Sequence, residues 1–256
     1  MKVLAAVMAM LTLGAGAARA HDLVLLPEGR ERVTVKFGHP QEYAAPDAEK
    51  LIELMGYFAG GGAPVSLLSA VGGATADHVT VDTGRYGKGH ELLLVWGEYD
   101  NGYFASDAAG RYFNTSKLHL PAARDSGAFF KFAKAIFPAA EAGGEFSRVL
   151  GEELEIIPQS DPFKTAPGAE LPVKVLYRGK PLAGVGVEIG DGQIRIAEAA
   201  IPRYQTNPAG IARVPIGKAG LKIIAVDYRT PPRFPQLSDH DDYGATLSFV
   251  LSPARQ

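Results

Sequence analysis

The chain has 256 residues, 46% of them hydrophobic, and a formal net charge of −2. This composition is typical of a globular protein with a packed core, and the lack of a basic tract argues against a nucleic-acid-binding protein. The sequence contains no cysteine, which excludes thiol nucleophiles, disulfides and thiolate metal sites. A bound metal ion would therefore need imidazole, carboxylate or amine ligands.

The first 20 residues have the pattern of a cleavable signal peptide. Lys2 precedes an apolar run over residues 3–13, and Ala18-Arg19-Ala20 forms an A-x-A cleavage site. We therefore expect an exported, periplasmic protein whose mature chain begins at His21. No other apolar run is long enough to span a bilayer, so we expect no transmembrane segment in the mature chain.

Frequent turn residues, 30 glycines and 18 prolines, divide the rest of the chain into short segments. Few segments show a helical period over three turns, and several alternate apolar and polar residues as half-buried strands do. The strands expected in the first part cover residues 23–26, 32–37, 78–81, 90–96 and 154–158, the last ending that part. Residues 47–58 and 129–138 are ambiguous between strand and short helix, and we favour a strand for the first of them.

Two patterns in this first part carry more detail. The apolar run at residues 92–96 suggests a strand that is buried on both faces. Asn101-Gly102 predicts the two-residue turn of an aromatic-rich hairpin, because both residues tolerate positive φ. Aromatic side chains of such a hairpin either fill a core or form a carbohydrate platform.

A linker is expected after the first part, where Asp161-Pro162 and Pro167-Gly168 cluster. The expected domains are an N-terminal β domain, 21–159, and a C-terminal β-sandwich, 160–256. The strands expected in the second domain cover residues 171–176, 185–189, 211–216, 221–228 and 245–251. The predicted fold class is all-β with two β-sandwich domains, the C-terminal one immunoglobulin-like or transthyretin-like.

Histidines are the main candidates for chemistry. An N-terminal His21 offers its α-amine and ring Nδ1 as a chelate for one metal ion, although cleavage there can also be coincidental. His240 is flanked by Asp239 and two further aspartates, which read either as ligands or as a solvated acidic loop. His39 in a turn and His90 at a strand start complete the predicted ligand set.

The remaining two histidines, His78 and His119, are expected at the surface. No H-x-H or H-x-x-x-H pair occurs, so only the fold can decide which histidines meet.

Several segments together resemble the DUF4198 family. They are His21-Asp22-Leu23, residues 98–117, Leu150-Gly151-x-x-Leu154-Glu155-Ile156-x-Pro158-x-x-Asp161-Pro162, residues 179–184 and Thr206-x-x-x-Gly210. That family is described as a periplasmic component of cobalt and nickel uptake systems, which implies a membrane metal transporter as partner. The chain departs from the family's usual start at Val24, where an aromatic residue is typical.

We therefore expect an exported protein that binds a divalent transition metal and serves nickel or cobalt uptake; copper and zinc also suit these ligands. No enzymatic activity is expected, because no G-x-S-x-G, H-E-x-x-H, P-loop or dinucleotide motif occurs. Two alternatives are a non-catalytic interaction or carbohydrate-binding module and a copper protein with an N-terminal His brace.

Overall fold

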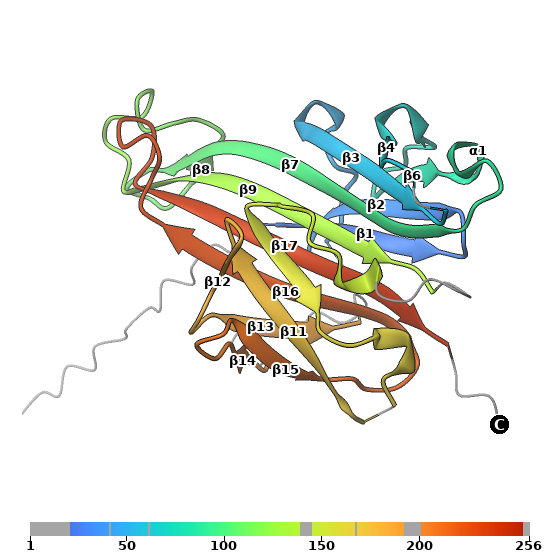
Figure 1. Cartoon of the computed structure of the whole chain (residues 1–256). Helices are drawn as coiled ribbons and strands as arrows, with labels where there is room; N and C mark the ends of the chain where they lie inside the picture. Colours follow the sequence, from blue (N-terminus) through green and yellow to red (C-terminus); the bar gives the residue numbers. More distant parts are fainter. Residues whose placement is uncertain are drawn as a thin grey trace, which may run out of the picture.

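The computed structural model describes residues 21–40, 42–60, 62–138, 145–166, 168–191 and 201–252. The predicted signal peptide, residues 1–20, lies outside these ranges. Strands form most of the regular structure, which confirms the all-β fold class (Figure 1). One short helix, α1 (Gly84–Gly87), and 3-10 turns at Ala48–Lys50, Leu68–Ala70, Glu145–Ser147 and Pro162–Lys164 are the helical segments described. No helix among the described residues is both long and apolar enough to cross a membrane.

The largest sheet runs through the whole molecule, and we call it the central sheet. Its strand order is β14-β13-β16-β17-β9-β7-β3-β4, with β8 paired to β7. These strands are β3 (Leu51–Phe58), β4 (Val65–Ser66), β7 (Leu92–Ser106), β8 (Tyr112–Phe113), β9 (Asp125–Ile136), β13 (Gly186–Gly190), β14 (Tyr204–Gln205), β16 (Gly220–Thr230) and β17 (His240–Leu251). The long strands β7, β9, β17 and β16 lie side by side (Figure 1).

Two smaller sheets complete the fold. The β1 sheet has the order β1-β2-β6-β5, with strands β1 (Asp22–Glu28), β2 (Arg32–Gly38), β5 (Val71–Gly72) and β6 (Val79–Asp82). The β11 sheet contains β10 (Leu154–Pro158), β11 (Glu170–Tyr177), β12 (Lys180–Pro181) and β15 (Ile211–Pro215).

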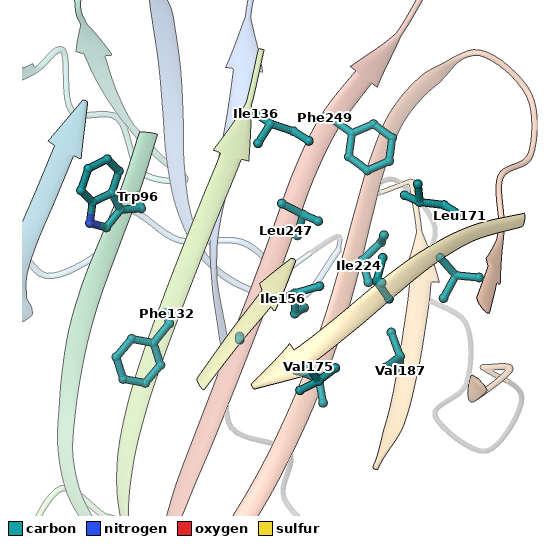
Figure 2. Packing of buried hydrophobic residues seen from close by; sticks show 14 of the residues in the cluster. Trp96, Phe132, Ile136, Ile156, Leu171, Val175, Val187, Ile224, Leu247 and Phe249 are labelled. Atoms are coloured by element: carbon teal, nitrogen blue, oxygen red, sulfur yellow. The ribbon is translucent and has the colours of Figure 1, made fainter. Parts of the chain in front are cut away.

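The small sheets cover opposite faces of the central sheet. Val95 and Ala133 join the core cluster that contains the β1-sheet residues, whereas Trp96 and Phe132 join the cluster of the β11 sheet. Successive residues of a strand point to opposite faces. The strand at residues 92–96 is therefore buried on both faces, as predicted. Figure 2 shows the cluster that contains the β11-sheet residues, with Leu247 packed near side chains of β10 and β11.

The halves of the chain are joined through the central sheet. β17 pairs in parallel with β9, from His240 opposite Gly127 to Ser248 opposite Ala135. The expected domains 21–159 and 160–256 thus share one sheet. Strand β10, which we expected to end the N-terminal domain, instead pairs with β11.

The predicted turn at Asn101-Gly102 is wrong. Both residues lie inside β7, and a register shift between Asp100 and Gly102 marks an irregularity in its pairing with β9. Asn101 is the extra residue of a β-bulge, because Asp100 and Gly102 pair with the adjacent residues Phe130 and Phe129. The strand continues through the positive φ of Gly102. The hairpin turn comes later, at residues 107–111, where β8 returns against the end of β7.

Candidate functional site

His21 and His39 meet at one end of the β1 sheet. β1 and β2 form an antiparallel hairpin with Asp22 opposite Gly38, and continuing this register by one residue places His21 opposite His39. The two imidazole centroids are 5.3 Å apart, and the His21 ring also lies 5.4 Å from the ring of Phe37. We call His21 and His39 the N-terminal histidine pair. The structure thus brings together two of the predicted ligands.

Asp22 lies beside this pair and connects it to a buried lysine. Its Oδ2 atom is 4.0 Å from His39 Nδ1, and its Oδ1 atom is 3.9 Å from Lys131 Nζ. Burial, and secondarily the negative charge of Asp22, raises the pKa of Tyr43 to about 12. Asp22 is thus a carboxylate beside the pair that also faces an ammonium group.

The N-terminal histidine pair supplies two nitrogen donors of the kind that borderline transition metals prefer. In the described ranges, no three histidine, aspartate or glutamate side chains form a group able to hold a metal ion. A site built on this pair therefore needs a further donor. Cleavage after Ala20 would provide one, because the α-amine of His21 is then attached to the residue that carries the first imidazole.

His240 has different surroundings. It is the first residue of β17 and is 7% exposed. Its Nε2 is 3.1 Å from Asp125 Oδ1, and its Nδ1 is 3.1 Å from Asp242 Oδ2. Arg229 contacts both oxygens of Asp242, at 2.7 and 2.9 Å. This histidine is thus enclosed between two carboxylates.

The electrostatics of this cluster favour a charged ring. Burial by itself opposes protonation of His240, but its contacts with Asp242 outweigh burial and raise the pKa of the imidazole. Burial likewise opposes ionisation of Asp242, yet hydrogen bonds from His240 and Arg229 lower the pKa of that carboxyl. The contacts with Asp242 therefore favour the protonated form of this ring.

Asp239, the other predicted ligand of this loop, points to different partners. Lys117 Nζ lies 2.6 Å from its Oδ1, and the hydroxyl of Ser126 donates to its Oδ2 at 2.7 Å. These two hydrogen bonds lower the pKa of Asp239. The contacts tie the loop before β17 to the neighbouring loop and to β9.

His90 lies far from the N-terminal histidine pair. His90 is exposed and lies just before β7. Its ring packs against Gly60, since a Cβ built on Gly60 would lie 3.1 Å from the imidazole Cε1. The next residue, Glu91, forms a 2.9 Å ion pair with Arg30 in the β1–β2 turn. The length of β1, about 20 Å, separates that turn from His21.

The two histidines expected at the surface are partly or fully exposed. His78 Nδ1 lies 2.8 Å from Asp77 Oδ1, and His119 is exposed in a turn. In the aromatic segment over residues 99–113, Tyr99 is 2% exposed, whereas Tyr112 and Phe113 are 47% and 42% exposed. The aromatic segment is therefore divided between core and surface.

Sequence reasoning missed several charged groups that the fold buries fully or in part, among them Lys131 and Glu152. Lys131 is 1% exposed, and the signal in the sequence was a lysine between Phe130 and Phe132. Glu152 has its pKa raised to about 8 by burial and then by the charges of Glu53 and Glu98. Glu53 accepts a 2.7 Å hydrogen bond from the buried Trp96 indole.

Comparison with known proteins gives one positive result. No curated protein and no solved structure matches the chain. The model of a domain of unknown function, DUF4198, matches residues 18–230, which is most of the chain. The protein whose N-terminal histidine pair is described above therefore belongs to the DUF4198 family.

Proposed function

We propose that this is an exported protein that binds a divalent transition-metal ion at the N-terminus of its mature chain and serves a nickel or cobalt uptake system. The observation that carries the proposal is the 5.3 Å separation of the His21 and His39 rings. Its partner would be a membrane metal transporter.

The proposed ligands are the two imidazoles of the pair and the α-amine that cleavage after Ala20 releases. Nitrogen donors of this kind suit nickel, cobalt, copper and zinc better than calcium or magnesium. Asp22, 4.0 Å from His39 Nδ1, favours the orientation in which Nε2 of that ring is the donor. We leave His240 and Asp239 out of the site because their carboxylate, hydroxyl and amine contacts engage them elsewhere.

Capture and release would depend on pH. An imidazole or amine binds metal only when it is deprotonated, so protons compete with the metal ion for all three donors. Histidine titrates near neutral pH, which makes release on mild acidification a built-in property of such a site. A metal-delivery protein requires this kind of reversible binding.

Copper is the second candidate, and the donor set itself favours it. One amine and two imidazoles form a His-brace arrangement, and Cu2+ binds nitrogen donors more tightly than Ni2+ or Co2+. Elemental analysis of protein purified from its export compartment, together with the electron paramagnetic resonance (EPR) spectrum of the Cu2+ form, distinguishes these metals. Protein without stoichiometric metal would instead favour an interaction module.

Calorimetry on the correctly processed chain tests the proposal. We expect His21→Ala and His39→Ala each to weaken Ni2+ or Co2+ binding about tenfold or more, because each removes a ligand. His78→Ala is the matched control, since it removes an imidazole that directly precedes β6 of the same sheet and lies beside Asp77. Unchanged affinity in both site variants would contradict the proposal.

A further inference from the structure

Lys131 is a buried cation behind the N-terminal histidine pair. Its side chain is 1% exposed, and its Nζ lies 3.9 Å from Asp22 Oδ1 and 3.7 Å from Asp227 Oδ1. An ammonium group withdrawn from water is costly unless negative charge lies nearby. The two carboxylates therefore compensate for the burial of this lysine.

The fold provides a path for this side chain. Lys131 in β9 is opposite Gly244 in β17, and Gly244 is in turn opposite Asp227 in β16. A Cβ at position 244 would collide with Lys131 Nζ and would lie 2.9 Å from its Cδ. The absence of a side chain at Gly244 thus allows the lysine to reach across β17.

Asp22 lies between this lysine and the histidine pair. One carboxylate oxygen faces Lys131, and the other is 4.0 Å from His39 Nδ1. If Asp22 turned toward a metal ion, the buried ammonium of Lys131 would lose one of the two carboxylates that compensate its charge. The ammonium would also repel the metal ion. Asp22, a carboxylate beside the proposed ligands, is therefore held back from coordination.

We propose that Lys131 is a positioning residue that determines metal selectivity by keeping Asp22 out of the coordination sphere. This inference rests on the proposed function. Because Asp22 is engaged, the site offers nitrogen donors alone, and it discriminates against hard cations such as Mn2+ that prefer carboxylate oxygen. Selectivity is thus set by a residue that does not touch the metal.

The test measures Ni2+ and Mn2+ affinities of the processed protein and its Lys131→Met variant. We expect Mn2+ affinity to rise about tenfold in the variant, with Ni2+ affinity changing much less. Adding Asp22→Asn to Lys131→Met should abolish the gain, because the gain requires the released carboxylate. A purely structural role of Lys131 would not change the ratio of the two affinities.

Lys134→Met is the matched control. Lys134 lies on the same strand, is 4% exposed, and pairs with Glu155 at 2.5 Å on the side of the β11 sheet. This variant also loses a buried lysine and its ion pair. We expect its Ni2+ to Mn2+ affinity ratio to equal that of the unaltered protein, and a shift as large as that of Lys131→Met would overturn the inference.

The outcomes separate the two proposals. Unaltered protein that binds no Ni2+, Co2+ or Cu2+ overturns both the proposed function and this inference. Protein that binds Ni2+ but keeps the same affinity ratio in Lys131→Met overturns the inference alone. If Lys131→Met does not fold, Cu2+ EPR spectra of the unaltered protein and Asp22→Asn decide. Nitrogen coordination in both supports the inference, and loss of an oxygen ligand in Asp22→Asn overturns it.

Discussion

His240 and the N-terminal histidine pair show two opposite uses of imidazole in one fold. His240 is 7% exposed and has a carboxylate 3.1 Å from each ring nitrogen. His21 and His39 instead lie ring to ring, with the Asp22 carboxylate 4.0 Å from one nitrogen. The first arrangement stabilises a bound proton, whereas the second suits a metal ion that requires deprotonated rings.

This difference shows that acidic neighbours in sequence can serve to hold a protonated imidazole in an ion-pair network. The aspartates around His240 favour the imidazolium form, and Arg229 already engages one of them. His39 has no acidic sequence neighbour, yet it faces a second imidazole. The four predictions below test this contrast, from the largest expected effect to the smallest.

Asp242→Ala should destabilise the fold most. It removes the partner of both His240 and Arg229, and charged hydrogen bonds of this kind contribute about 2–3 kcal/mol. Urea unfolding near pH 6 measures the change in the free energy of unfolding. Asp77→Ala is the control, because Asp77 contacts His78 at 2.8 Å but is 52% exposed. Equal losses in the two variants would show that burial does not distinguish the two pairs.

Blocking the α-amine of His21 should weaken metal binding without affecting the fold. A mature chain acetylated at the α-amine of His21 keeps all six histidines but has no free amine for the chelate. We expect Ni2+ affinity, measured by calorimetry, to fall about tenfold, because the metal ion loses one of its proposed donors. Identical affinities of the acetylated and unacetylated chains would remove the amine from the site.

The stability contributed by His240 should depend on pH. Its pKa is raised in the folded protein, so the folded state binds the proton more tightly than the unfolded state. The stabilisation is therefore complete below the unfolded value of about 6.5 and is lost as pH rises through the folded value.

Urea unfolding of the unaltered protein and His240→Gln across pH 5–9 measures this window. The difference in unfolding free energy should be largest at the acidic end and should decrease as pH rises. A difference that grows with pH would mean that the buried ring is neutral.

His240→Gln should have the smallest effect, a change in Ni2+ affinity of less than about twofold. Substitutions at a distance from a site, with no shared contacts, usually couple to it only weakly. The register places His240 opposite Gly127 and Lys131 opposite Gly244, about 13 Å apart along the strands. Calorimetry on this variant near pH 7.5 makes the measurement. A tenfold loss would return His240 to the metal site.

Much of the fold follows from local patterns. Alternation located β1, β2 and β6 to within a few residues, and the apolar run at residues 92–96 predicted burial on both faces. The contact between His21 and His39 also has a local cause, because a hairpin of the two predicted strands places these residues opposite each other. The register of a hairpin depends on its turn, which the sequence nearly specifies.

Other features have no local cause. Asn101-Gly102 resembles a turn, but pairing of Asp100 and Gly102 with β9 keeps the chain extended there. The parallel pairing of β9 with β17 joins segments more than a hundred residues apart, and it alone brings Lys131 near Gly244 and Asp227. Such pairings depend on the burial of whole sheet faces, which a window of sequence does not contain.

The sequence by itself therefore determined the all-β class, the family resemblance, the exclusion of thiol ligands and the choice of His21 as the leading candidate. The tertiary structure decided which charged groups surround each histidine. It placed His240 between two carboxylates and Lys131 behind Asp22. The physical reason is that ligand type is a property of single residues, whereas proximity and burial are properties of the packed sheets.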